Sequence, residues 1–134
     1  MARILPLVLR CLAIGCILPG LWHLILGADG DWLVGIIVAN EIDPSLDSQN
    51  RFYGAIFIGF GAAIWWAAGR IIERHALIRI VLMAMLLGAI GRGFAYATHG
   101  APSADVLLLW GSELVLPPLL WFWLNAHLRA GARL

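Results

Sequence analysis

Four long apolar segments constrain this sequence more than any other feature. They cover residues 4–26, 52–72, 77–97 and 106–128. Each has about the 20 residues that an α-helix needs to cross a hydrocarbon core of about 30 Å. Apolar residues make up 62% of the 134-residue chain, against about 45–50% in soluble domains. The sequence therefore predicts an all-α integral membrane protein, a single domain folded as an antiparallel four-helix transmembrane bundle.

The first apolar segment follows a basic start, Met1-Ala2-Arg3, which also fits a cleaved signal peptide. No small-x-small cleavage site follows the apolar residues. We therefore favour a spanning helix over residues 4–26 and keep the signal peptide as the alternative.

Residues 27–49 differ from the four spans in composition. Five carboxylates flank a short apolar patch at residues 32–39, and Pro44 is expected to break any long helix. Eight apolar residues are too few to cross a bilayer. We expect an outer loop whose apolar patch lies in the membrane interface or folds over the mouth of the bundle, with a plain loop as the alternative.

The charged residues divide between the two sides of a four-span topology. One side carries Arg3, Arg10, Arg70, Arg74, Arg79, Arg129 and Arg133. The other side carries Asp29, Asp31, Glu41, Asp43, Asp47 and Asp105. Because loops rich in arginine stay in the cytoplasm, both termini are expected to be cytoplasmic.

Two opposite charges, Arg92 and Glu113, lie inside the third and fourth apolar segments. At 1.5 Å per residue, Arg92 lies about 7 Å inward from residue 97, and Glu113 lies about 11 Å inward from residue 106. A tight hairpin would bring them together at similar depth. The pair is expected either to lock the hairpin or to serve a ligand or proton path, because intramembrane charges do both.

Further polar residues fall near the same outer side. His23 lies near the outer end of the first span, and Asn50 and Arg51 precede the second. Together with Arg92 and Glu113 they form a candidate ligand-binding polar pocket that faces outward. We expect no catalytic residues, no metal and no cofactor, because no paired His or Cys ligands and no nucleophile motif occur. A net charge of +1 without a basic patch argues against a nucleic-acid partner.

The second apolar segment is rich in small residues. Gly59 and Gly61 are expected to face neighbouring helices, because small residues let membrane helices approach closely.

Several short motifs resemble a known family. They are Asn50-Arg51-Phe52-Tyr53-Gly54, Gly91-Arg92, Gly100-Ala101-Pro102-Ser103, and Glu113 with Pro117. Together they resemble the bacterial membrane family called domain of unknown function 4345, over about residues 4–128. The resemblance implies a four-helix inner-membrane protein and no established activity. The layout is also distantly similar to DoxX-like and Erg28-like proteins, with no catalytic motif to transfer.

Two functions from different classes follow. The first is a non-catalytic scaffold or binding protein that engages a lipophilic small molecule or a membrane protein partner within the lipid bilayer. The alternative is a membrane subunit of a quinone-linked oxidoreductase. A small-solute transporter is disfavoured because the sequence lacks inverted repeats.

Overall fold

The computed structural model describes residues 4–36 and 41–131. Its long helices are α1 (Ile4–Leu26), α2 (Pro44–Ala68), α3 (Ile71–His99) and α4 (Ala104–Gly131), and a short 3-10 helix, η1 (Gly27–Val34), follows α1. The four long helices are long and apolar enough to cross a membrane. The chain is therefore an all-α, multi-pass membrane protein with the expected four spans.

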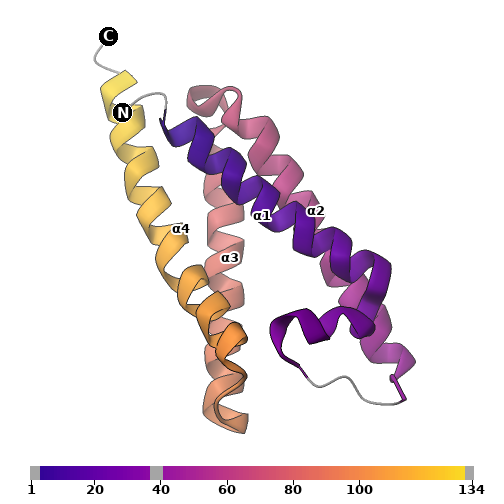
Figure 1. The fold of residues 1–134 in the computed structure, drawn as a ribbon. Coiled ribbons are helices and arrows are strands. Elements are labelled where there is room, and N and C mark those ends of the chain that lie inside the picture. Colours follow the sequence, from indigo (N-terminus) through magenta and orange to yellow (C-terminus); the bar gives the residue numbers. More distant parts are fainter. Residues whose placement is uncertain (1–3, 37–40, 132–134) are drawn as a thin grey trace.

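The helices form two antiparallel hairpins, α1 with α2 and α3 with α4 (Figure 1). We call the end that holds the start of α1, the α2–α3 turn and the end of α4 the terminal end, and the opposite end the distal end. The hairpins lie close together at the terminal end and diverge towards the distal end (Figure 1). At the distal end η1 lies between them, and a Cβ placed on Gly35 would be 2.9 Å from Asp105 at the start of α4.

The hydrophobic core belongs to the terminal half of the molecule. It is built from the first half of α1, the second half of α2, the first half of α3 and the second half of α4. Its largest fully buried side chains are Leu5, Leu9, Ile64, Ile78, Leu82 and Leu124. The hairpins are thus joined by apolar packing mainly at one end.

Close packing of α1 on α2 depends on small residues spaced seven apart. A Cβ on Gly54 would lie 2.7 Å from the Gly20 carbonyl oxygen, and one on Gly61 would lie 2.6 Å from the Ala13 carbonyl oxygen. The prediction for Gly61 is confirmed. The prediction for Gly59 is wrong, because no atom lies within 4 Å of its Cβ position. Gly59 is two residues from Gly61, which turns it to another face of the helix.

The second span starts earlier than the sequence pattern indicates. The outer loop was expected to run to residue 49, whereas α2 begins at Pro44. Proline suits the first turn of a helix, and Asp43 provides the cap by accepting a 2.6 Å hydrogen bond from the Ser45 N–H. This bond holds the pKa of the Asp43 carboxyl below its usual value. The ionised cap stabilises the helix start above the ordinary carboxyl pKa, and the stabilisation is lost as the pH falls through the lowered value.

The rest of the expected outer loop is also partly helical. Residues 27–34 form η1 directly after α1, so this part of the connection between the first two spans is a short 3-10 helix. Trp32 is exposed, and its ring packs edge-on against Trp22 with the centroids 5.6 Å apart. Residues 37–39 of the predicted apolar patch lie outside the described residues. The placement of this patch in the membrane interface stays a prediction.

The turn between α2 and α3 also differs in position. The second span was expected to end at residue 72 and the third to start at residue 77, whereas α2 ends at Ala68 and α3 begins at Ile71. The chain turns at Gly69 and Arg70. Arg74 keeps a distorted backbone inside α3, at φ −114° and ψ 15°. Its guanidinium donates to the Trp66 carbonyl oxygen at 2.7 Å and lies over the Trp66 ring.

Candidate functional site

Arg51 on α2 binds the end of α1. Its Nη1 donates to the carbonyl oxygens of Leu24 at 3.0 Å and Ile25 at 2.8 Å. The last carbonyls of a helix have no partner within it, so Arg51 caps α1. Its Nε donates to Asp47 at 2.8 Å, and Asp47 also accepts a 3.0 Å hydrogen bond from the Ala28 N–H. One carboxylate therefore holds the capping arginine and the start of η1.

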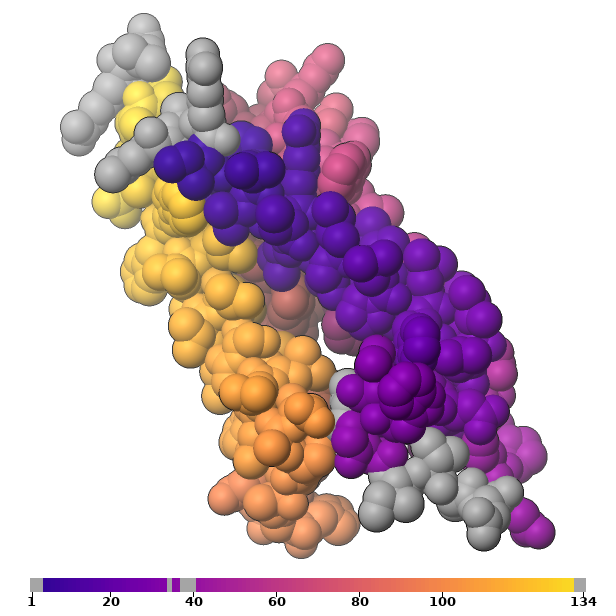
Figure 2. Space-filling view, in the orientation of Figure 1, coloured from indigo at the N-terminus to yellow at the C-terminus, as the bar shows by residue number. Residues whose placement is uncertain are grey.

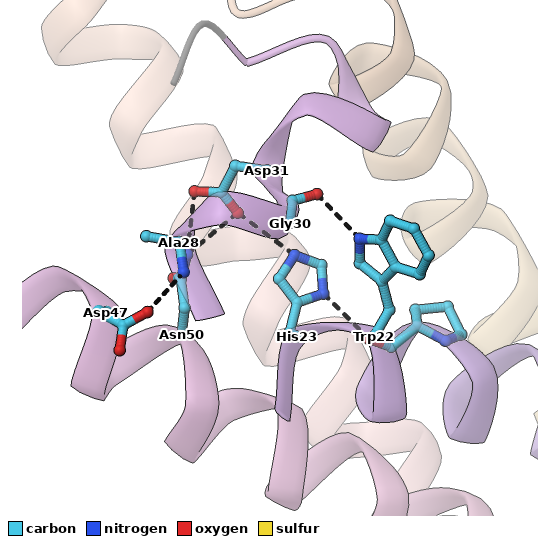
Figure 3. Close-up of polar contacts among 8 residues, drawn as sticks. Trp22, His23, Ala28, Gly30, Asp31, Asp47 and Asn50 are labelled. Carbon is cyan, nitrogen blue, oxygen red and sulfur yellow. Dashed lines mark hydrogen bonds and ion pairs between the residues drawn. The ribbon is translucent and has the colours of Figure 1, made fainter. Parts of the chain in front are cut away.

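Asp31 in η1 contacts two of the expected site residues, Asn50 and His23 (Figure 3). Asn50 donates to its two carboxylate oxygens at 3.0 and 2.9 Å. His23 Nε2 lies 3.3 Å from Asp31 Oδ1, while Nδ1 of the same ring lies 3.0 Å from the Pro19 carbonyl oxygen. We call His23, Asp31, Asp47, Asn50 and Arg51 the distal polar network.

The backbone at Gly27 and Gly30 contributes to the contacts around the distal polar network. Gly27 has φ +61°, in the left-handed region that favours glycine, and a side chain there would collide with the Asp47 carboxylate. Trp22 donates from Nε1 to the Gly30 carbonyl oxygen at 3.0 Å (Figure 3). These contacts fold η1 back against α1 and α2.

Arg92 and Glu113 form a separate ion pair between α3 and α4. Arg92 Nε donates to Glu113 Oε2 at 2.8 Å. The predicted pairing across the hairpin is confirmed. The two partners differ in exposure, because the Glu113 side chain is 9% exposed and the Arg92 side chain 36%.

Trp110 covers the neighbouring turn of this hairpin. Its Nε1 donates to the Ala89 carbonyl oxygen at 2.7 Å, and its ring edge lies 3.3 Å from the Cβ position of Gly93. Tyr96 adds a ring contact with centroids 5.6 Å apart. Aromatic packing therefore accompanies the ion pair towards the distal end.

The five expected site residues thus fall into two sets. His23, Asn50 and Arg51 belong to the distal polar network, whereas Arg92 and Glu113 bind each other. Within residues 4–36 and 41–131, no hydrogen bond or ion pair joins the two sets. That these five residues form one ligand-binding pocket stays a prediction.

An apolar groove lies between α3 and α4, on the terminal side of the ion pair. It has a volume of about 220 Å³. We call it the α3–α4 groove, and its lining residues are Leu82, Met83, Leu86, Pro117, Pro118, Trp121 and Phe122. Pro117 and Pro118 lack N–H groups, so the helix carbonyls one turn earlier lose their usual donors.

A family model matches the chain from the first helix into the fourth. Its description is Domain of unknown function (DUF4345), and the match covers residues 4–124. The chain belongs to this family. The resemblance seen in the sequence motifs is therefore confirmed. No curated protein and no solved structure matches the chain.

Sequence reasoning missed two partners in this DUF4345 protein. Asp31 and Asp47 were counted only as charges of an outer loop. The spacing of Asp47 and Arg51 did contain a signal, because residues four apart share a helix face and favour ion pairing. No local signal identifies Asp31, since its contacts arise from the fold of η1 onto α2.

Metal ligands and the serine next to Glu113 are further functional groups to consider in this DUF4345 chain. In the part of the chain that the structure describes, no group of three or more His, Cys, Asp or Glu side chains could hold a metal ion. Ser112, next to Glu113, donates to the Leu109 carbonyl oxygen at 2.7 Å. A serine nucleophile needs an adjacent base, and this hydroxyl is bonded to its own helix.

Proposed function

We propose that this chain is a non-catalytic protein of the bacterial inner membrane that binds a lipophilic molecule. The α3–α4 groove carries this proposal, because its lining side chains are all apolar and all lie within spanning helices. Small-molecule sites are concave and mostly apolar. The groove offers a hydrocarbon chain apolar contacts along its length, and none of its lining side chains is charged.

The polar residues support binding over catalysis. Arg92 and Glu113 bond to each other, and the distal polar network bonds to the ends of α1 and η1. These hydrogen bonds are enough to explain the placement of the polar groups by a structural role, which supports binding over catalysis. We therefore place the lipophilic molecule in the α3–α4 groove and give the outward-facing polar residues a secondary role in binding.

The proposed orientation has both termini in the cytoplasm. Arg10, Arg70, Arg74 and Arg129 lie at or near the terminal end, and cytoplasmic ends of spans are rich in arginine. Of the remaining three arginines of this side, Arg79 lies further into α3, and Arg3 and Arg133 lie outside the described residues.

Reporter fusions test this orientation. Alkaline phosphatase fused after Leu134 is expected to be inactive, and the same enzyme inserted after Glu41 is expected to be active, because phosphatase folds only in the periplasm. The second fusion is the matched control for expression. If the fusion after Leu134 is active and the fusion after Glu41 is inactive, the orientation is inverted. A mass measurement of the intact protein must accompany this result, to show that the first helix has not been cleaved.

Filling the groove tests the proposed binding. Met83 lines the groove, whereas Ile80 lies on the same helix outside it, and both side chains are exposed. We expect Met83→Trp to lower the amount of lipophilic molecule that copurifies in mild detergent at least several-fold, because the indole occupies the groove. Ile80→Trp should leave that amount unchanged. Mass spectrometry of the extracted protein measures both.

The identity of the retained molecule separates the functional classes. A bound quinone displaced by Met83→Trp would favour the alternative of an oxidoreductase subunit. Equal retention by the wild type and both variants would remove the groove as a binding site.

A further inference from the structure

Arg79 is a charged residue inside a membrane-spanning helix. It lies eight residues after the start of α3 at Ile71, about 12 Å along the helix axis. Its Nη2 donates to the Asn125 side-chain oxygen at 2.7 Å, and its guanidinium lies 5.4 Å from the centroid of the Trp121 ring. Its Nε is buried and has no hydrogen-bond partner.

Three other described arginines have an anionic partner, which Arg79 lacks. Arg51 pairs with Asp47, Arg70 with Glu73 and Arg92 with Glu113. Within the described ranges, no carboxylate lies in ion-pair distance of Arg79. A charge within a span is costly unless it is paired, and a neutral amide and an aromatic ring compensate it only in part. The site around Arg79 therefore lacks a negative charge.

Arg79 lies at the terminal mouth of the α3–α4 groove. Met83 and Leu86, which line the groove, follow Arg79 by four and seven residues on the same face of α3. On α4, Trp121 and Pro118 precede Asn125 by four and seven residues. Trp121 takes part in both features, since it lines the groove and also lies under the guanidinium. The cation and the apolar groove thus form one continuous site.

The charge around this mouth is basic. The terminal end also carries Arg10, Arg74 and Arg129 among the described residues, and its carboxylate Glu73 is already bonded to Arg70 at 3.3 Å. Basic groups at the membrane surface attract anionic lipids, by about 1 kcal/mol for each group. An apolar groove that ends at an unpaired cation has the chemistry of an anionic phospholipid, with a hydrocarbon chain and a phosphate at one end.

We propose that the α3–α4 groove binds one acyl chain of an anionic phospholipid whose phosphate accepts hydrogen bonds from the Arg79 guanidinium. The lipid belongs to the leaflet at the terminal end, which is the cytoplasmic leaflet in the proposed orientation. Arg79 is half-buried, so part of its side chain is accessible to a ligand from outside the helix pair. This inference rests on the proposed function and names the ligand class of the same groove.

Lipid competition tests the proposal on the purified full chain. The protein is exposed to equal amounts of phosphatidylglycerol and phosphatidylcholine with identical dioleoyl chains, and bound lipid is read by native mass spectrometry. We expect the wild type to retain the anionic lipid about fivefold over the zwitterionic one, the preference that one basic group provides. Arg79→Gln should bring this ratio close to one. Arg10→Gln removes a charge from an arginine stacked on Trp65, away from the groove, and should lower the ratio less than Arg79→Gln does.

Further variants and a phosphate competition distinguish a wrong headgroup assignment from a wrong binding site. An unchanged lipid ratio in Arg79→Gln, while Met83→Trp still displaces lipid, would overturn the headgroup assignment and leave the groove intact. If Arg79→Gln does not fold, Arg79→Lys replaces it and is expected to keep a preference above one. Excess inorganic phosphate should not displace phosphatidylglycerol from the wild type. Displacement would show that the site holds a free anion and would also overturn the proposal.

Discussion

Replacing Arg92 with alanine is expected to destabilise the folded chain more than replacing its partner Glu113. Breaking a fully buried ion pair costs about 3–5 kcal/mol, and the partial exposure of Arg92 lowers our expectation to about 2–3 kcal/mol. Arg92→Ala leaves a carboxylate that is 9% exposed, whereas Glu113→Ala leaves a guanidinium that is 36% exposed. A long arginine side chain can also extend towards the membrane interface, so its isolation is less costly.

A double-mutant cycle in detergent measures this coupling. The double variant Arg92→Ala with Glu113→Ala should be more stable than Arg92→Ala alone, because no charge is left unpaired. Leu108→Ala, which truncates an exposed side chain on α4, serves as the control for surface changes in the same hairpin. Single losses that simply add, with a coupling near zero, would show that the ion pair does not hold the hairpin together.

Gly54→Ala is expected to produce the second large loss of stability. A Cβ there would lie 2.6 Å from the Leu24 nitrogen and 2.7 Å from the Gly20 oxygen. These are backbone atoms, so α1 and α2 must separate to make room. Overpacking of this kind typically costs about 1–3 kcal/mol.

Gly59→Ala is the matched control, because it makes the same chemical change in the same helix at a position with open space. Alanine favours a helix over glycine by up to about 1 kcal/mol, so Gly59→Ala should leave stability unchanged or raise it. Thermal unfolding followed by circular dichroism compares the two. Equal effects would mean that Gly54 does not mark the contact between α1 and α2.

The sequence allowed the spans and one side-chain pair to be predicted for clear physical reasons. Length and hydropathy define four helices, and the shared depth of Arg92 and Glu113 follows from counting along a short hairpin. The start of α2 was missed because Pro44 was treated as a breaker, although proline also favours a first helical turn. The α2–α3 turn was misplaced because the second apolar segment was continued past Gly69 through Ile71 and Ile72, which belong to the start of α3.

The distal polar network was less accessible to sequence reasoning. Its central acceptor, Asp31, is brought to His23 and Asn50 only when η1 folds back on the hairpin. Helical periodicity does not describe such a segment. Arg79 illustrates a different limit, because sequence places it with the basic residues of one side, and only the structure shows the groove that begins beside it.

The uneven distribution of the core has a consequence for how the two hairpins move. Apolar packing joins them near the terminal end, whereas the contacts at the distal end are largely polar or lie within one hairpin. Figure 2 shows the hairpins packed together at the terminal end and, towards the distal end, as two arms with η1 between them against the start of α4. A change in the angle between the arms therefore leaves most of the buried apolar surface in place. We therefore expect any change in the spacing of the hairpins to occur at the distal arms, where a neighbouring lipid or protein meets fewer buried apolar contacts, with the terminal core as the fixed point.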